Sequence, residues 1–561
     1  MYSQKLEPLL NLSLNLTSDE RRKSGELDAG YDETSGVWEL IVRYVGDIEF
    51  LKNIGIRIVY LINNYAILYV KTDNIEMITQ MEQIIYIEKP KRLYYSVVSG
   101  KRATGVDFLI NEGYKGKGVF TACIDSGIDF SHPEFRKNDG STRIFCMWDQ
   151  SDNRGTAPQG YDFGSVYFSD EINMMLEKGV RTNNDFSGHG THVAGIMAGN
   201  SGIASESEII VVKLGRARSG GFPLTSEIMM AVNFVINIGV VVNRPIAVNL
   251  SIGNNYGSHD GNSLLETFID TAVDYGRSVM CVGAGNEGDA QIHTSGKLSE
   301  SSEEVVELEV GEFQTSFSAQ IWKEFVDDFS VRIRIPGFYS EELIVSDDVV
   351  QSFSLTDMQI KIINGYPSPY SRYQDIYIDF IPDKEEGFVR PGIWRIILTG
   401  KKIVVGQYDM WLPAGVGRVK NTRFLRPDPY TTLTIPSTSR KVISVGAYDV
   451  TTGRAAIFTG RGYTRLNRSV KPDLVAPGVD IISAMSGGGY TALSGTSMAC
   501  PFVTGIAAVL MEKYILSGTD SYLYGEKMKE FLIKNARKLL GQNKVPDEIY
   551  GYGGVYVPRR Q

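Results

Sequence analysis

Three residues that lie far apart along the chain are of the types that together hydrolyse peptide bonds. Ser497 stands in a turn of small residues just before the apolar run 503–511, which places it in the first turn of a buried helix. Backbone N–H groups in that turn lack an intrahelical partner, and the helix dipole favours negative charge there. A serine hydroxyl in this position suits nucleophilic attack, because the oxyanion that the attack creates is stabilised.

The Ser497 hydroxyl needs a base, and the sequence offers one. His189 follows a Ser-Gly pair at the start of a predicted helix, and Asp125 ends an apolar run. A neutral imidazole can take the hydroxyl proton, and a carboxylate can hold that imidazole in the right tautomer. The order Asp, His, Ser differs from the orders found in α/β-hydrolases and in chymotrypsin-like enzymes. The three residues together therefore predict a catalytic triad.

Each of these residues also has a plainer interpretation when it is taken singly. Asp125 can be a turn residue before Gly127, Ser497 an ordinary first-turn helix residue, and His189 a structural histidine. His192 follows His189 by three residues, so a metal-binding histidine pair also stays open. The joint occurrence of the three segments favours catalysis over these alternatives.

The segments that begin at Asp125, His189 and Gly495 resemble the signature blocks of subtilisin-like serine proteases, the peptidase S8 family. A further segment, residues 283–288, resembles the oxyanion segment of that family. The resemblance implies that Asn286 and the backbone N–H of Ser497 bind the tetrahedral oxyanion. It also implies a substrate-binding role for a set of small residues and one isoleucine: Ser251, Ile252, Gly253, Gly283, Ala284, Gly285, Gly220 and Gly221.

The elements that must position these residues alternate between strands and helices. Continuous apolar runs, typical of parallel strands buried on both faces, occur at residues 119–124, 209–214, 246–252, 278–284 and 442–447. Helical periodicity occurs between them, at residues 190–198, 226–238, 263–275 and 498–514. This pattern predicts a doubly wound α/β core with a parallel sheet, in which ligands bind at the carboxyl ends of the strands. Residues 148–175 are expected to form an extra surface excursion.

Two further units accompany the α/β core. Residues 38–93 follow the order βαββαβ, with a hairpin at Asn63 and Asn64, which predicts a ferredoxin-like α+β unit. This unit is either an independent binding module or a propeptide, and the resemblance to subtilisins favours an inhibitory propeptide. Short alternating segments with frequent Pro and Gly predict an inserted all-β sandwich or jelly roll, entered through an acidic linker with a solvated edge at residues 303–309. The predicted domains are 1–96 (N-terminal extension and propeptide), 97–290 (catalytic domain, first part), 291–431 (β insert) and 432–561 (catalytic domain, second part).

Composition narrows the classes of partner. The net charge is −9 over 561 residues and no basic stripe occurs, which argues against nucleic acid as a partner. The four cysteines are expected to be buried thiols. No zinc motif occurs, and the short segment after His189 offers few oxygen ligands, so we expect no metal and no cofactor, with Glu134 as a solvated carboxylate. No signal peptide and no apolar window of about 20 residues is evident, which predicts synthesis in the cytoplasm without a membrane span.

The sequence thus predicts a serine endopeptidase that acts on protein substrates and cleaves its own propeptide near Tyr94, Tyr95, Ser96 and Val97. The missing signal peptide, the propeptide and the β insert together resemble the Csp germination proteases of spore-forming clostridia. That resemblance implies activation of a cortex-lytic hydrolase zymogen, a cleaved propeptide that stays bound, and packaging in the spore. The alternatives are a catalytically silent sensor or scaffold protein, and an esterase that uses the same triad.

Overall fold

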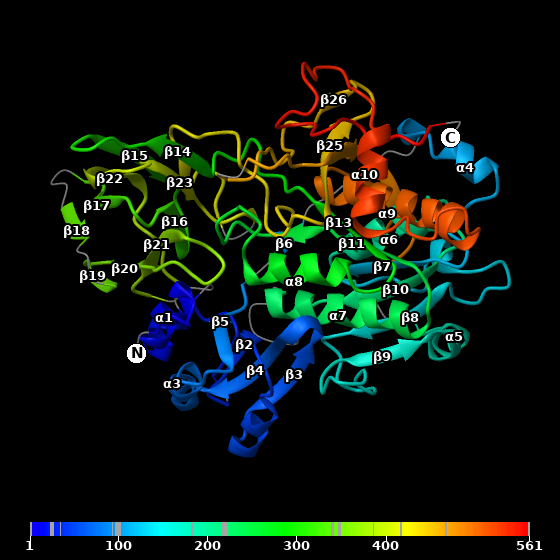
Figure 1. The fold of residues 1–561 in the computed structure, drawn as a ribbon, viewed down its shortest axis with the longest axis horizontal. Coiled ribbons are helices and arrows are strands. Elements are labelled where there is room, and N and C mark those ends of the chain that lie inside the picture. The colour runs from blue at the N-terminus through cyan, green and yellow to red at the C-terminus, as the bar shows by residue number, and fades with distance from the viewer. Residues whose placement is uncertain are drawn as a thin grey trace.

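The computed structural model describes residues 3–22, 27–33, 35–91, 94–95, 102–180, 185–215, 223–337, 342–345, 349–384, 386–415, 418–465 and 468–558. Three parts are visible in Figure 1: a small N-terminal unit in blue, an all-β part in green and yellow, and an α/β part that contains the C-terminal helices. The N-terminal unit contacts both of the others.

The N-terminal unit is a small antiparallel sheet with short helices. The strands are β1 (Tyr31–Asp32), β2 (Val37–Tyr44), β3 (Arg57–Leu61), β4 (Tyr65–Lys71) and β5 (Ile84–Glu88), in the order β1-β2-β4-β3 with β5 beside β2. The left-handed residues Asn63 and Asn64, with φ of 56° and 60°, form the predicted hairpin between β3 and β4. The first predicted helix is a 3-10 helix (Glu49–Ile54) and the second is α3 (Ile75–Thr79). Two helices that the sequence analysis did not assign, α1 (Pro8–Leu14) and α2 (Ser18–Arg22), precede the sheet.

The α/β part is built on a nine-stranded sheet, and the five apolar runs predict five of its strands. Its order is β26-β25-β13-β11-β7-β10-β8-β9, with β27 beside β25. All neighbours are parallel except β9 and β26, which lie antiparallel to their partners. The strands are β7 (Phe120–Asp125), β8 (Ile144–Asp149), β9 (Ser165–Phe168), β10 (Glu208–Lys213), β11 (Ile246–Leu250), β13 (Ser278–Gly283), β25 (Ile443–Asp449), β26 (Arg454–Ala455) and β27 (Leu474–Pro477).

The expected surface excursion at residues 148–175 is partly wrong. It begins inside β8, where the Trp148 side chain is fully buried, and continues through β9 into α5 (Ser169–Glu177). Trp148 packs against Tyr161, Phe163 and Phe234, so this segment extends the sheet at its edge. The apolar pattern of residues 144–149 is too short to separate a strand from a loop by periodicity alone.

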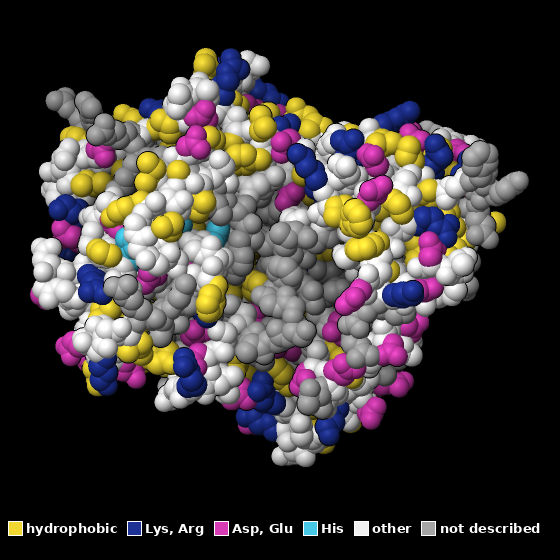
Figure 2. All heavy atoms as spheres, turned by 180° about the vertical axis from the view of Figure 1, so that it is seen from behind, with side chains coloured by type: hydrophobic (Ala, Val, Ile, Leu, Met, Phe, Trp, Pro, Cys, Tyr) yellow, Lys and Arg dark blue, Asp and Glu magenta, His cyan; other side chains and the backbone are white. Residues whose placement is uncertain are grey.

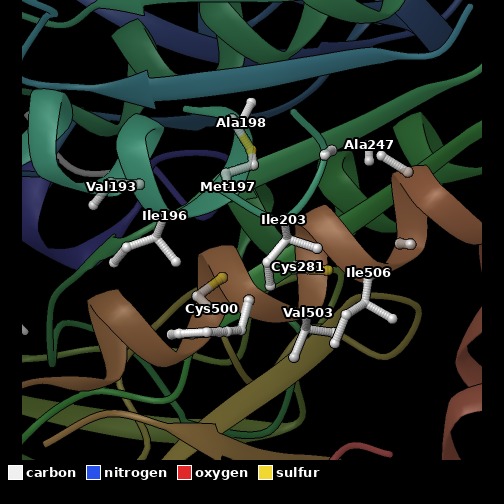
Figure 3. Close-up of a cluster of buried hydrophobic side chains, with 14 of the residues drawn as sticks. Val193, Ile196, Met197, Ala198, Ile203, Ala247, Cys281, Cys500, Val503 and Ile506 are labelled. Atoms are coloured by element: carbon white, nitrogen blue, oxygen red, sulfur yellow. The ribbon is translucent and has the colours of Figure 1, made fainter. Parts of the chain in front are cut away.

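Helices cover both faces of the large sheet. Helices α7 (Thr225–Val241) and α8 (Leu264–Val273) share one apolar cluster with strand residues on one face. Helices α6 (His189–Ala198) and α9 (Thr496–Met511) pack against each other on the opposite face, where Val193, Met197 and Cys500 meet in Figure 3. Helices α4 (Asp107–Asn111) and α10 (Gly525–Asn535) complete this part. All four cysteines are buried and unpaired, which confirms the expected thiols.

Helix α9 is strongly apolar. Together with the π-helical segment that follows, Thr496–Leu516, it has 21 residues and a mean hydropathy of 1.5, which suffices to cross a membrane by length and composition. The sequence analysis did not anticipate such a stretch. The most apolar part of this segment is 78% buried within the protein. It is the central core helix, hydrophobic all round because neighbours cover every side.

The all-β part consists of two antiparallel sheets. One has the order β14-β23-β16-β21-β20-β19 and the other β18-β17-β22-β15-β24. Side chains from both sheets share one core, in which the Phe380 ring stacks on Phe317 and meets Trp394 edge-on. The strands are β14 (His293–Lys297), β15 (Glu303–Val310), β16 (Phe317–Glu324), β17 (Asp328–Arg334), β18 (Glu342–Val345), β19 (Val350–Ser354), β20 (Met358–Asn364), β21 (Tyr373–Pro382), β22 (Gly392–Lys402), β23 (Gln407–Trp411) and β24 (Arg423–Phe424).

The solvated edge expected at residues 303–309 is instead strand β15. Its apolar side chains Val306 and Leu308 enter the core, while Glu307 and Glu309 lie on the opposite face. Glu307 pairs with Arg395 at 3.0 Å and Glu309 with Arg423 at 2.9 Å. These two glutamates therefore belong to cross-strand ion pairs, an arrangement that a charge run alone does not reveal.

Candidate active site

Asp125 and His189 meet at the carboxyl edge of the large sheet. Asp125 is the last residue of β7 and is fully buried, and His189 opens α6 after Gly188, whose φ of 74° lies in the left-handed region that glycine favours. The His189 Nδ1 atom lies 2.6 Å from Asp125 Oδ1, and the Asp125 carboxylate also accepts the N–H of Ser126 at 2.7 Å. This contact orients the ring with Nε2 directed away from Asp125.

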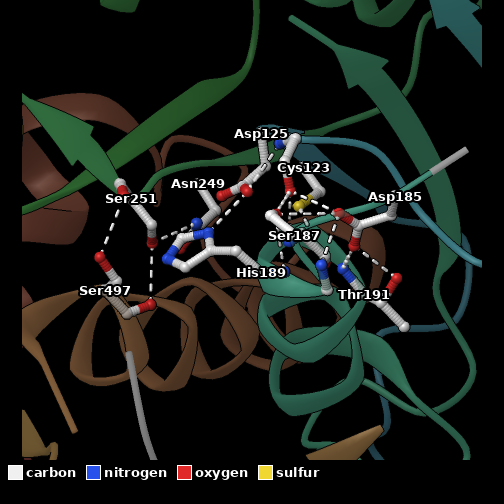
Figure 4. A network of polar contacts seen from close by, with 12 residues as sticks. Cys123, Asp125, Asp185, Ser187, His189, Thr191, Asn249, Ser251 and Ser497 are labelled. Atoms are coloured by element: carbon white, nitrogen blue, oxygen red, sulfur yellow. Dashed lines mark hydrogen bonds and ion pairs between the residues drawn. The ribbon is translucent and has the colours of Figure 1, made fainter. Parts of the chain in front are cut away.

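Ser497 lies on the other side of that imidazole. It is in the first turn of α9, and in Figure 4 the His189 ring stands between Asp125 and the side of the site that holds Ser497 and Ser251. The Ser497 hydroxyl donates to the Ser251 carbonyl at 3.0 Å, and the Ser251 hydroxyl donates to the Ser497 carbonyl at 2.9 Å. The structure thus brings the three predicted residues together, with the nucleophile hydrogen-bonded to Ser251 in this state. Transfer of the Ser497 proton to His189 would require this hydroxyl to turn away from Ser251, and contacts of this kind commonly tighten only when substrate binds.

The predicted oxyanion residue faces the same pocket. The Asn286 Oδ1 atom accepts the backbone N–H of Thr496 at 2.8 Å, and the Thr496 hydroxyl accepts the N–H of Gly285 at 3.1 Å. With its oxygen used in this way, the side-chain amide of Asn286 presents its NH₂ group to the pocket. That pocket has a volume of about 260 Å³ and is lined by both Asn286 and Ser497.

A short strand occupies the predicted substrate edge. Strand β12 (Ile252–Gly253) pairs antiparallel with β6 (Tyr94–Tyr95), so that Ile252 lies opposite Tyr95 and Gly253 opposite Tyr94. Residue 253 must be glycine here, because a Cβ would lie 2.6 Å from the Thr434 hydroxyl. The chain that leaves the N-terminal unit therefore lies along this edge as an added strand, the way extended peptides bind to sheet edges.

The other predicted substrate-binding residues divide into three groups. Ser251, Gly283 and Gly285 line the pocket. Ala284 is fully buried and does not line it, since its backbone is hydrogen-bonded to Val445 and Thr434 behind the pocket wall. Gly220 and Gly221 lie outside the described residues, as do Ser96 and Val97 of the predicted cleavage region.

Asp185 is a functional residue that the sequence analysis missed. Its Oδ1 accepts the hydroxyl of Ser126 at 2.7 Å and the N–H of Gly188 at 3.0 Å, and its Oδ2 accepts the N–H of Thr191 at 2.7 Å (Figure 4). The Ser126 hydroxyl in turn accepts the N–H of Gly190 at 2.9 Å. Buried Asp185 thus ties the segment after Asp125 to the helix start that carries His189. The signal in the sequence was a carboxylate four residues before that histidine.

The metal-site alternatives find no support in the geometry. His192 is buried, its Nε2 lies 3.2 Å from the Thr491 carbonyl, and burial lowers its pKa to about 4. Glu134 is buried rather than solvated, which corrects the expectation for it: its carboxylate accepts the N–H of Ser201 and the hydroxyl of Tyr490, each at 2.7 Å. Burial alone raises the pKa of Glu134, but these hydrogen bonds outweigh it and lower the pKa below its usual value. Among the described residues, no three His, Cys, Asp or Glu side chains are grouped to hold a metal ion.

Comparison with known proteins gives a consistent result. The family model described as "Subtilase family" matches residues 116–374 and 421–553, and the one described as "Csp protease B prodomain" matches residues 4–91. The solved structure of the CspB protease of Clostridium perfringens is 34% identical, covers 81% of this chain and 95% of that chain, and superposes with a TM-score of 0.74.

Curated relatives are longer and more distant. The PI-type proteinase of Lactococcus lactis subsp. cremoris is 25% identical over 510 residues, which are 80% of this chain and 25% of that protein. The minor extracellular protease Vpr of Bacillus subtilis is 24% identical over 426 residues, which are 71% of this chain and 46% of that protein. The chain therefore spans less than half the length of these two relatives. The family match, the shared architecture with CspB and the meeting of Asp125, His189 and Ser497 all agree: the chain belongs to the subtilase family and carries a Csp-type prodomain.

Proposed function

We propose that this chain is a serine endopeptidase that works through an acyl-enzyme. The observation that carries the proposal is the 2.6 Å contact of His189 with Asp125 beside a pocket shared by Ser497 and Asn286. The Ser497 oxygen attacks the scissile carbonyl while His189 Nε2 takes its proton, and Asp125 stabilises the imidazolium. Asn286 and the Ser497 N–H bind the oxyanion, and the proton then passes to the leaving amine as the C–N bond breaks. Water attacks the acyl-enzyme by the same route.

The first substrate we propose is the chain itself. The antiparallel pairing places Tyr94 opposite Gly253 and Tyr95 opposite Ile252, so the strand runs towards Ser251. The Ser251 carbonyl is the group to which Ser497 is hydrogen-bonded. This direction supports cleavage shortly after Tyr95, and within the region that the sequence predicts we propose the bond between residues 96 and 97.

We expect the purified protein to contain two polypeptides, the larger of which begins at Val97. The measurement is N-terminal sequencing together with intact mass, and the smaller piece should have a mass of about 10 kDa, in proportion to 62.2 kDa for 561 residues. A larger piece that begins more than two residues away from Val97 contradicts the proposed cleavage site. Labelling of the protein by a fluorophosphonate, which reacts with activated serines, tests the nucleophile independently of the cleavage position.

We propose further that the cleaved propeptide stays bound, because it is held by both other parts of the protein. Leu9 and Leu12 of α1 share an apolar cluster with Tyr377 of the β insert, and Glu20 pairs with Lys361 of the insert at 2.6 Å. On the α/β part, the N–H of Ile62 donates to the Asn233 side chain at 3.1 Å, and Tyr65 and Thr267 share a hydroxyl hydrogen bond of 2.9 Å. Cleavage after residue 96 breaks none of these contacts.

The junction of the three parts makes retention of the propeptide depend on pH. Lys91 pairs there with Glu7 and Glu88 in a pocket that Asp375 of the insert also lines. Burial, with the nearby Glu7 carboxylate, raises the pKa of Asp375 to about 7. The stabilisation from neutral Asp375 is complete below its ordinary pKa of 3.8 and is lost as pH rises through about 7.

We therefore expect the cleaved propeptide to dissociate faster at pH 9 than at pH 6. The measurement is the dissociation rate of the small fragment, followed by size-exclusion chromatography at the two values of pH. Asp375→Asn, which is neutral throughout, should reduce this difference, and the part that remains is expected to come from Glu88, whose pKa burial also raises. Asp357→Asn, on the exposed side of the same insert, should preserve the full difference. An Asp375→Asn protein with unchanged pH dependence contradicts this assignment.

The similarity to CspB supports a finer proposal about the substrate. We infer that the mature enzyme cleaves a cortex-lytic hydrolase zymogen during germination and is packaged in the spore for that purpose. The test is incubation of the zymogen from the same organism with the wild-type protein, with release of the mature hydrolase as the expected result. The runner-up, a catalytically silent sensor or scaffold, is not favoured, because every triad residue and Asn286 is present in the site.

A further inference from the structure

The β insert contributes a wall to the pocket beside Ser497. Ala414, Gly415 and Arg418 line it, and all three lie between β23 and β24 at the end of the insert. This segment is fixed in place at both ends. The Asn255 amide donates to the Leu412 carbonyl at 3.2 Å, and the N–H of Val419 donates to the Gln314 side chain at 2.9 Å.

Arg418 holds a positive charge in this pocket with donor capacity to spare. Its Nη1 donates to the carbonyls of Val419 at 3.3 Å, Lys420 at 3.4 Å and Thr422, which fixes the guanidinium on its own loop. Its Nε is buried and lies out of reach of a ligand, whereas its Nη2 group is not buried and donates to none of the described residues. An acceptor atom of a ligand in the pocket can therefore take a hydrogen bond from Nη2.

Glu287 brings an opposite charge to the same pocket, directly after the oxyanion residue Asn286. Burial raises the pKa of Glu287, while the Arg418 charge and a hydrogen bond from the Gly415 backbone oppose the rise. The same burial lowers the pKa of Arg418, and Glu287 opposes that change. Arg418 and Glu287 therefore interact electrostatically across the pocket. Towards a ligand, Arg418 can donate a hydrogen bond and Glu287 can accept one.

We propose that Arg418, supplied by the β insert, selects substrates whose P1 side chain is uncharged and polar, with an amide or a hydroxyl group. Such a side chain accepts a hydrogen bond from Arg418 and donates one to Glu287. A Lys or Arg at P1 is repelled by Arg418, an acidic side chain is repelled by Glu287, and a Leu offers a hydrogen bond to neither group while it displaces water from both. Ser96, at the proposed cleavage position, belongs to the selected class. The inference rests on the proposed protease function and gives the insert a direct role in specificity.

The experiment uses self-cleavage of the full chain, with residue 96 as the P1 position. The proteins to be compared are wild type, Ser96→Gln, Ser96→Leu and Ser96→Lys. Each is made with Arg418 intact and with Arg418→Ala. Pulse-chase labelling measures the rate at which the full chain is converted into its two cleavage products. We expect chains with Ser or Gln at position 96 to be cleaved about 10–100-fold faster than chains with Leu or Lys there, since each unpartnered buried group lowers the rate by about one to two powers of ten. Arg418→Ala should bring the four rates close together, because cleavage of the Ser96→Lys chain becomes faster and cleavage of the Ser96→Gln chain becomes slower.

Two controls distinguish a wrong role for Arg418 from a lack of protease activity. Arg423→Ala removes an arginine of the same insert that pairs with Glu309 outside the pocket, and it should leave the order of rates unchanged. Labelling of Ser497 by a fluorophosphonate reports a folded site without using the P1 pocket. If the Arg418→Ala chain still labels and keeps the wild-type order of rates, or if wild type cleaves Leu as fast as Ser, the inference about Arg418 is overturned. If wild type does not cleave at all and does not label, the protease function itself fails.

Discussion

The chain with Ser497→Ala is expected to remain a single polypeptide of 62.2 kDa, while the wild-type protein separates into two pieces. Removal of the nucleophile leaves the oxyanion donors and the binding edge intact, yet no acyl-enzyme can form. Loss of the equivalent serine slows subtilisin about 10⁶-fold, so no cleavage should be seen over days. Intact mass spectrometry provides the measurement. A melting temperature near that of the wild type is expected as well, since the change deletes one hydroxyl and its bond to Ser251.

A matched control for this experiment is Ser494→Ala, three residues earlier and exposed to solvent. It changes the same chemical group without touching the pocket, and it should cleave at the wild-type rate. If the Ser497→Ala chain separates into the same two pieces, another nucleophile or a host protease makes the cut. The assignment of Ser497 as the nucleophile would then be wrong, even though His189 and Asp125 are in contact.

Replacement of Asp125 by Asn is expected to lower the turnover number by about 10⁴. The Asp125 Oδ1 atom lies 2.6 Å from His189 Nδ1, and an amide can present its NH₂ group there, which places the ring in the wrong tautomer. The imidazolium also loses its stabilising charge. The fold should persist, because Asn has the size and shape of Asp, although the Ser126 N–H, which bonds to the same Oδ1 atom as His189, then loses its acceptor. The measurement is the rate of fluorophosphonate labelling alongside the rate of self-cleavage.

Asp139→Asn serves as the control for that substitution. Asp139 is an exposed carboxylate that accepts hydrogen bonds from Ser141 in a surface turn, so the same chemical change there should have no effect on either rate. An Asp125→Asn protein that labels and cleaves as fast as wild type shows that the carboxylate does not assist His189. The mechanism would then need a different orienting group.

The sequence predicts the α/β architecture and the positions of Asp125 and Ser497 at the ends of their elements, because both depend on local patterns. A parallel strand covered on both faces must be continuously apolar, and the residue that ends it must lie at the edge where ligands bind. Asp125 at the end of β7 and Ser497 at the start of α9 follow from this alone. The hairpin at Asn63 and Asn64 follows in the same way from residues that tolerate left-handed conformations.

What the sequence does not reveal depends on contacts between distant segments. Asp185 and Arg418 are ordinary charged residues by type, and only the fold places one against the helix start that carries His189 and the other in the pocket beside Ser497. Glu134 shows the same limit, since the hydroxyl of Tyr490, more than three hundred residues away, helps to bury it. Helices α1 and α2 were missed because they pack on the β insert and the N-terminal sheet, and short helices have weak periodicity of their own.

The order of the segments along the chain sets when the site can assemble during synthesis. Strand β6 pairs with residues 252–253, whereas Ser497 lies in α9, which shares a core cluster with Met528 and Leu532 of α10. A ribosome must therefore have released the chain beyond α9 before Ser497 can reach this edge. If the proposed self-cleavage takes place, a nascent chain that stops short of α9 keeps its N-terminal unit attached.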